Sequence, residues 1–422
     1  MTTPLDGRTA PERTPTRHLT LAVLALAMGG FAIGTTEFVT MGLLPQIADG
    51  VSTSIPQAGH VISAYALGVV VGVPLITVFG ARLPRRGLLI GLMAVFAVGN
   101  AASALAGSFG TLTAARFLSG IPHGAFFGAA SLVAAGMVDP AKRGRAVSMV
   151  MLGLPIANIV GVPVATWMGQ QLGWRSAYFA VAAMGLLTMA LVFAFVPSSP
   201  ADLEASPRRE LRFFGRAQVW LTLLIGAIGF GGMFAMYSYI APTVTEVTGL
   251  SYSLVPLFLL AFGLGGTVGT AVAGRLADWS ILRSLVVGTF GMGASLLLFT
   301  VTARYAVPAV ATVFASAALG SVMVVNLQMR LMSVAGDAQM LGAAMNHASL
   351  NLANALGAWL GGLVIGAGFG YTSPSWVGAG LSFAGLLVLG LSVLLHRRDL
   401  AAATALDEEA RQVSGNSSAS MS

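Results

Sequence analysis

Residues 19–48 read LTLAVLALAMGGFAIGTTEFVTMGLLPQIA and contain a single charged residue, Glu37. About 20 apolar residues are enough for a helix to cross the roughly 30 Å hydrocarbon core of a membrane. Backbone groups in that core must be hydrogen-bonded within the segment, which favours helices over isolated strands. Similar runs recur near 57–79, 87–107, 109–136, 146–170, 176–197, 218–247, 253–274, 284–303, 305–329, 340–367 and 374–396. The sequence therefore predicts an all-α membrane protein with twelve transmembrane helices.

Composition supports this interpretation. Of the 422 residues, 56% are hydrophobic and 9% are charged, whereas soluble domains carry roughly 25% charged residues. The first run is too long for the 7–15-residue apolar core of a cleaved signal peptide, so we expect it to remain as a span. The chain has no cysteine, which excludes disulfides and thiolate metal sites. The net charge of +7 reflects basic loops and tails, and we expect no nucleic-acid partner.

The distribution of basic residues predicts the topology. Alternate connecting segments and both tails are rich in Arg and Lys, whereas the remaining loops hold only Arg175 and Arg304. Positive charge is concentrated in cytoplasmic loops, so both termini are predicted to be cytoplasmic in a bacterial plasma (inner) membrane.

The chain divides into five predicted regions. A cytoplasmic tail, residues 1–18, precedes a six-helix bundle formed by residues 19–197. A cytoplasmic linker containing Pro and Arg, residues 198–217, leads to a second six-helix bundle formed by residues 218–396. Residues 397–422 form a polar cytoplasmic tail that is predicted to be disordered.

The two bundles also resemble each other in sequence. Gly34–Pro45 parallels Gly231–Pro242 at an offset of 197, and Ala157–Gly161 parallels Ala353–Gly357 at an offset of 196. Two six-helix repeats predict a substrate site at their interface near the membrane midplane, with rocking between the halves.

Charged and polar groups inside the spans are the first candidates for function, because they are costly in hydrocarbon. Glu37 is the only acid deep within a span and is predicted to carry protons, with Arg116 as its counter-charge and His123 as a relay or substrate contact. Each has a structural alternative: Glu37 can fix helix packing, Arg116 can extend to the membrane interface, and His123 can be a hydrogen-bonded core residue.

Other polar residues are predicted to line a substrate cavity, although they can equally bond neighbouring helices together. They are Asn158, Tyr237, Tyr239, Gln328, His347, Asn351 and Asn354. In the fifth span, Gly153, Gly161 and Pro163 predict a bendable groove for gating, with simple helix packing as the alternative.

Several of these motifs together resemble the major facilitator superfamily, closest to its twelve-span drug:proton antiporters of the arabinose-efflux and chloramphenicol-resistance type. The resemblance covers nearly the whole chain and rests on Gly34–Pro45, on Arg116 with Gly120 and His123–Phe127, and on Gly153–Gly169. The last stretch resembles the helix-five motif of exporters. The family's loop motif consists of Gly, then Asp four residues later, then Arg. In the first half Gly80 and Arg85 match this motif, but Pro84 stands in the Asp position. In the second half Gly274 and Asp278 match it, but Trp279 stands in the Arg position. These four residues are further gating candidates.

The resemblance implies proton-coupled efflux of small molecules such as drugs or sugars by alternating access. A sugar uniporter or proton symporter of the same fold is the alternative. No nucleophile–base set, metal cluster or phosphate-binding loop is visible, so we expect neither an enzyme nor an ATP-driven pump. The expected partners are a small-molecule substrate, protons and the lipid bilayer; no metal or cofactor besides the proton gradient is expected, and the chain is expected to be a monomer.

Overall fold

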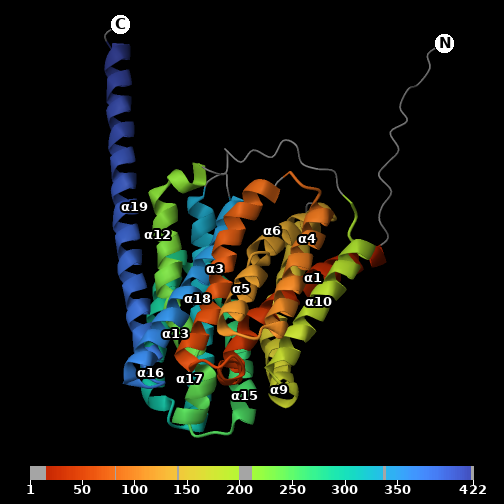
Figure 1. The fold of residues 1–422 in the computed structure, drawn as a ribbon. Helices are drawn as coiled ribbons and strands as arrows, with labels where there is room; N and C mark the ends of the chain where they lie inside the picture. The colour runs from red at the N-terminus through yellow and green to blue at the C-terminus, as the bar shows by residue number, and fades with distance from the viewer. Residues whose placement is uncertain (1–15, 81, 140–141, 199–211, 336–338, 420–422) are drawn as a thin grey trace, which may run out of the picture.

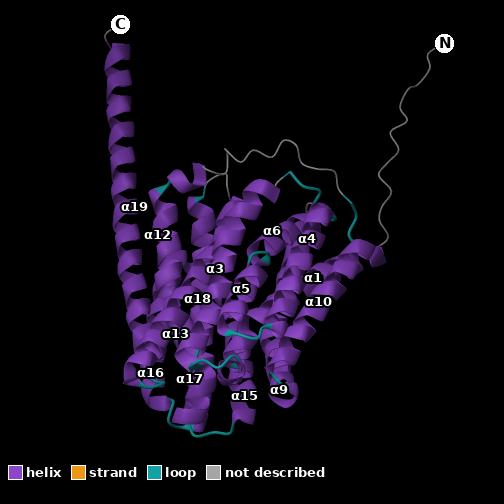
Figure 2. Ribbon diagram, in the orientation of Figure 1, coloured by secondary structure: helices purple, strands orange, loops and turns teal. Residues whose placement is uncertain are grey.

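The structure, a computed structural model, describes residues 16–80, 82–139, 142–198, 212–335 and 339–419. These residues are almost entirely helical, and the described ranges contain no strand (Figure 2). Twelve helical spans in the described ranges are long and apolar enough to cross a membrane, which confirms the predicted fold class. Residues 1–15 of the N-terminal tail, residues 199–211 of the linker and residues 420–422 lie outside the described ranges.

The first half of the chain supplies six spans. Its helices are α1 (Thr16–Gly42), α2 (Leu44–Gly50), α3 (Ile55–Gly80), α4 (Arg85–Leu105), α5 (Phe109–Gly120), α6 (His123–Gly136), α7 (Arg143–Met151), α8 (Gly153–Ile156), the π-helix η2 (Ala157–Gly161), α9 (Val162–Leu172) and α10 (Trp174–Phe195). Together α5 and α6 form one span, and the segments from α7 to α9 form another.

The second half repeats this plan. Its helices are η3 (Arg212–Gly215), α12 (Ala217–Leu224), η4 (Ile225–Gly229), α13 (Gly231–Tyr237), α14 (Ile240–Pro242), η5 (Thr243–Val247), η6 (Tyr252–Leu254), α15 (Val255–Trp279), α16 (Ile281–Thr302), α17 (Ala306–Val334), α18 (Gln339–Val364), η7 (Ile365–Phe369) and α19 (Ser373–Ala419). The helix α1 begins and α19 ends at the same face of the molecule, here called the terminal face; the opposite one is the far face (Figure 1).

The first and seventh spans are shorter than predicted because both break at equivalent places. The first span ends at Gly42 and the seventh at Tyr237, where the sequence predicted spans to residues 48 and 247. Proline has no backbone N–H, so Pro45 and Pro242 cannot donate to the carbonyl groups four residues earlier. Each helix stops and restarts just before its proline.

The C-terminal segment differs from the prediction. Residues from 397 onward were expected to be disordered, but α19 continues to Ala419. The segment following Leu400 begins with several Ala and Glu residues, which have high helix propensity. The helix propensity of these residues favours continuation of α19, whereas the low hydrophobicity of the segment had favoured the prediction of disorder.

Candidate functional site

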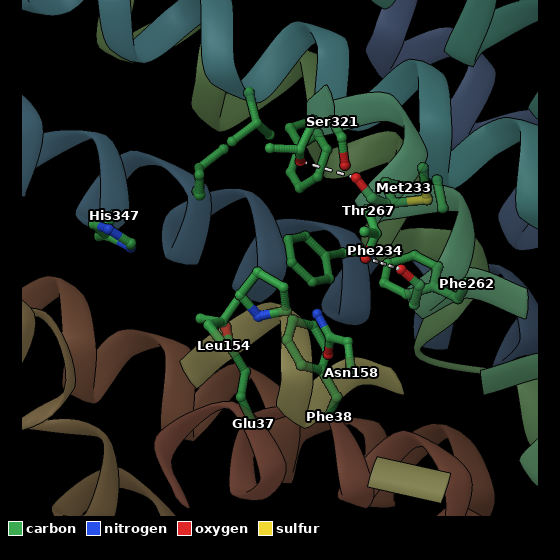
Figure 3. Close-up of a pocket in the computed structure, with 18 of the residues that line it drawn as sticks. Glu37, Phe38, Leu154, Asn158, Met233, Phe234, Phe262, Thr267, Ser321 and His347 are labelled. Atoms are coloured by element: carbon green, nitrogen blue, oxygen red, sulfur yellow. Dashed lines mark hydrogen bonds between the residues drawn. The ribbon is translucent and has the colours of Figure 1, made fainter. Parts of the chain in front are cut away.

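A cavity lies between the two halves of the chain, on the terminal side of the break at Gly42. Its volume is about 200 Å³, and its walls come from α1, α6, α8 and η2 in the first half and from η4–α13, α15, α17 and α18 in the second (Figure 3). From Glu37 and Phe38 in α1 it extends toward the terminal face as far as Thr270 and Val324. Among the described residues that line it, Glu37 is the only acid, and Lys and Arg are absent.

The central wall of the cavity is aromatic. Phe38 stacks against Phe234 with ring centroids 6.3 Å apart and contacts Phe262 at 6.2 Å. Phe230 packs edge-on against Phe234 at 5.3 Å. The sequence analysis did not predict this group. One available signal was Phe262, because the two halves align Gly68 with Phe262 at an offset of 194 (262 − 68).

Glu37 lies where the sequence predicted, deep in α1 and only 5% exposed. Its carboxyl group borders the cavity and faces the Asn354 side chain of α18. Both polar atoms of Asn354 are buried and make no hydrogen bond. The carboxyl group of one half therefore lies near a buried amide of the other.

Arg116 is fully buried in α5, which rules out extension to the membrane interface. Its guanidinium donates to the hydroxyl of Thr36 at 2.9 Å and to the Thr36 carbonyl at 3.0 Å. It also lies over the rings of Tyr65 at 4.3 Å and Tyr178 at 5.3 Å, a favourable arrangement for a desolvated cation. No ion pair with Glu37 occurs in the described residues, and Arg116 does not line the cavity.

The bond to Thr36 continues to a third helix. Because Arg116 can only donate, the Thr36 hydroxyl must give its own proton elsewhere, and it donates to the side-chain oxygen of Asn100 in α4 at 2.5 Å. The Asn100 amide nitrogen in turn donates to the Phe96 carbonyl at 2.8 Å. Donor and acceptor are therefore assigned in each hydrogen bond from Arg116 through Thr36 and Asn100 to the Phe96 carbonyl.

His123 and His347 approach each other from opposite halves. Their rings lie 6.2 Å apart, and His347 stacks on Phe127 with centroids 5.4 Å apart and an interplanar angle of 4°. The Nδ1 of His123 lies 3.1 Å from the Tyr65 hydroxyl, whereas its Nε2 is buried without a partner. Both histidines line the cavity, as do Asn158 and Asn351.

The remaining predicted cavity residues do not line it. The ring of Tyr237 stacks on Phe262 at 3.8 Å, behind the aromatic wall, and the Tyr239 hydroxyl donates to the Ala358 carbonyl at 2.7 Å. Gln328 is half-buried and is not among the residues that line the cavity.

On the far-face side, three hydrogen bonds join the halves. The Tyr252 hydroxyl of η6 donates to the Gly42 carbonyl at 2.7 Å, at the end of α1. The Gln170 amide nitrogen donates to the Tyr252 carbonyl at 2.9 Å, and Ser63 donates to the Ala355 carbonyl at 3.0 Å. These contacts, here called the far-face seal, close the interface beyond the cavity.

The predicted gating residues fall in two places. Gly153 and Gly161 pack against α1 within the first half, near Phe31 and Thr35, rather than between the halves. The opposite side of the same span makes the cross-half contact, because Gly263 of α15 lies against the Asn158 backbone.

The π-helix η2 precedes Pro163, which cannot donate to the Ile159 carbonyl. Near the terminal face, Gly80 packs against Leu88 and Arg85 begins α4, while Gly274 and Asp278 are exposed on α15. Gly153 and Gly161 therefore shape the contact with α1. The residues Gly80, Arg85, Gly274 and Asp278 lie at the ends of spans.

Comparison with known proteins agrees with this architecture. The sequence profile of the Major Facilitator Superfamily matches residues 26–345. The chain is 42% identical to the inner membrane transport protein YdhP of Escherichia coli over 88% of this chain and 94% of that protein. It is 31% identical to a chloramphenicol resistance protein of Streptomyces lividans over 87% and 95% of the two chains. The fold is similar to that of a D-xylose–proton symporter, with a TM-score of 0.72, 17% identity and coverage of 88% and 97%.

Proposed function

The chain belongs to the major facilitator superfamily, and from that premise we propose that it exports small molecules in exchange for protons. It is a multi-pass inner-membrane transporter of small molecules, not an enzyme. The observation that carries the proposal is the position of Glu37. It is a buried carboxyl group on the wall of a cavity between the two halves. In the proposed function, protonation and substrate binding therefore share one place.

In the proposed cycle, substrate enters the cavity from the terminal face, which we place in the cytoplasm from the distribution of arginine. Substrate that contacts Glu37 favours release of its proton, because protonated and charged carboxyl groups offer different hydrogen bonds. Opening of the far-face seal then exposes the cavity to the other side. There, substrate leaves and Glu37 takes up a proton again, which resets the transporter.

Arg116 supports this exchange from behind the cavity wall, and His123 supports it from the wall itself. Arg116 holds Thr36, the residue next to Glu37, so a small rotation of α1 would bring the guanidinium toward the carboxylate once the proton has left. His123 has an unpartnered Nε2 for a substrate acceptor or a proton. The cavity residues Asn158, His347 and Asn351 add polar contacts around the aromatic wall.

Export of drug-like molecules is favoured over sugar uptake by two features. The central wall is aromatic, and a relative covering most of this chain is named for chloramphenicol resistance. The symporter neighbour supports the fold alone, since it shares 17% identity. We further propose that the transporter acts as a monomer, because the cavity is built from a single chain.

The experiment is uptake into proteoliposomes with an acidic lumen, using chloramphenicol and D-xylose as probes. An antiporter of drug-like molecules accumulates chloramphenicol when protons flow outward, and Glu37→Gln removes this accumulation. The matched control is Glu246→Gln, which changes an exposed acid on the far-face side outside the cavity. Xylose accumulation driven by an inward proton gradient, or equal activity of Glu37→Gln, would contradict the proposal.

A further inference from the structure

A second hollow lies away from the transport cavity, on the outside of the second half. It is a groove of about 520 Å³ between α15 and α17. The two helices make their closest contact where Gly265 and Gly269 lie against the backbone of Phe314 and Ala318. The groove begins beyond that contact, on its far-face side, and runs from Leu264 and Phe314 to Leu254 and Val307.

The lining of the groove is apolar throughout. Every described residue along it is Leu, Phe, Val or Ala. Water does not occupy a cavity without polar partners, and an empty groove forfeits packing contacts with its walls. The groove belongs to two membrane-spanning helices and opens on their outer surface, where Leu257 is 48% exposed and Val307 is 79% exposed. Hydrocarbon is the surrounding solvent there, so a lipid acyl chain is the occupant that fits.

A cation stands at the far-face end of the groove. Arg304 lies in the turn between α16 and α17, just before Ala306 and Val307, which line the groove. The turn is anchored, because Thr248 donates to the Ala303 carbonyl at 2.7 Å. The Arg304 side chain is exposed, and the described part of the structure contains no hydrogen bond or ring contact for its guanidinium. Tyr305 beside it is 62% exposed, as is common for tyrosine at a membrane interface.

The other arginine of the far-face loops is arranged differently. Arg175 donates to the Ala106 carbonyl at 3.0 Å and lies 4.3 Å over the ring of Trp174. Its guanidinium is thus used within the protein. The contrast marks Arg304 as a cation available to a ligand.

We propose that this groove is a phospholipid-binding site. One acyl chain lies between α15 and α17, and the phosphate is held by the guanidinium of Arg304, which matches phosphate geometry through paired N–H donors. Tyr305 lies at headgroup depth beside it. Any phospholipid supplies the acyl chain and the phosphate, so the site selects for these two features together.

Native mass spectrometry of the full-length protein, delipidated in detergent and mixed with phosphatidylglycerol or phosphatidylcholine, tests the proposal. We expect one tightly retained phospholipid. Arg304→Gln should weaken its retention by about fivefold, the effect of one arginine at a membrane surface. Ala311→Phe, which fills the groove, should abolish it. The matched controls are Arg175→Gln and Val98→Phe, a substitution on a lipid-exposed face of α4.

Three results would overturn the proposal. Retention unchanged in Ala311→Phe places the lipid elsewhere. Retention lost in Ala311→Phe but unchanged in Arg304→Gln shows a hydrocarbon groove without a phosphate site. A dimer that disappears in Ala311→Phe shows that a second copy of the chain occupies the groove. Size-exclusion chromatography of each variant confirms that it is folded.

Discussion

Arg116 donates hydrogen bonds to both the hydroxyl and the carbonyl of Thr36, the residue that precedes Glu37, the only acid among the described residues that line the transport cavity. A guanidinium cannot release its charge in a protein. In this conformation two tyrosine rings and two oxygen atoms contact the guanidinium, and no carboxylate among the described residues forms an ion pair with it. Glu37 faces the second half instead. The cation is therefore bonded to the residue next to the acid, and no ion pair between Arg116 and Glu37 occurs in the described residues.

The first prediction concerns the proton carrier. Glu37→Gln should bind substrate without releasing a proton, because an amide cannot titrate, whereas Glu37→Asp should keep partial activity with a reach shortened by one methylene. A pH indicator in weakly buffered detergent solution measures proton release when chloramphenicol is added. If Glu37→Gln releases as many protons as the parent protein, the carrier is another group, and His123 is the next to test.

The second prediction concerns the Arg116–Thr36–Asn100 bonds. Thr36→Val keeps the side-chain shape but removes the hydroxyl that accepts from Arg116 and donates to Asn100. Leaving buried donors and acceptors unpaired costs about 1–3 kcal/mol, so the midpoint of thermal unfolding in detergent should fall. Thr36→Ser, which keeps the hydroxyl, is the control. An unchanged midpoint in Thr36→Val would show that these bonds add no net stability.

The third prediction concerns the far-face seal. Tyr252→Phe removes the hydrogen bond to the Gly42 carbonyl while leaving the ring in place. A hydrogen bond of this kind contributes about 0.5–1.5 kcal/mol, so the population open to the far face should rise roughly two- to tenfold. Because the chain has no cysteine, Asn158→Cys is a clean reporter inside the cavity. Its reaction with an impermeant maleimide added from the far face should accelerate in Tyr252→Phe.

The control for this measurement is Tyr305→Phe. That tyrosine is exposed on the same face, and in the described residues its hydroxyl makes no hydrogen bond. Equal labelling rates in the two variants would mean that the Tyr252 hydroxyl does not hold the halves together.

The fourth prediction concerns orientation. Single cysteines at Ser54 and Thr372, in far-face loops, should react with an impermeant thiol reagent in intact cells. A cysteine at Ser206, in the predicted linker, should react only after permeabilisation. Labelling of Ser206 in intact cells would place the basic loops outside and reverse the proposed direction of transport.

Hydropathy predicted the twelve spans because each must match the thickness of the hydrocarbon core, and composition alone reports that constraint. It also located Glu37, since an acid in such a run stands out. Hydropathy does not predict how each helix is rotated about its axis, because the rotation depends on which neighbouring helices each face contacts. Tyr237 and Tyr239 are polar residues in a span, yet one packs behind the aromatic wall and the other bonds to Ala358.

The partner of Arg116 was beyond the sequence for a related reason. Charge complementarity pointed to Glu37, but a buried guanidinium is also satisfied by backbone carbonyls, hydroxyls and ring faces, which no sequence pattern distinguishes. Thr36 and Asn100 come together only because α1, α4 and α5 meet at one depth. The hydrogen bond from Tyr252 to the Gly42 carbonyl could likewise not be predicted, because that carbonyl is available only where α1 ends.

Among its described lining residues, the transport cavity holds one acid, Glu37, and no Lys or Arg, and this affects how the membrane voltage acts on transport. If Glu37 returns one proton for each molecule expelled, export of an uncharged molecule moves one net positive charge inward, and the membrane voltage drives it. That contribution is about 2.3 kcal/mol per 100 mV for each elementary charge. Export of a singly charged cation would move no net charge and would depend on the pH difference alone. Export of uncharged substrates would therefore generate a measurable current, whereas export of monovalent cations would generate none.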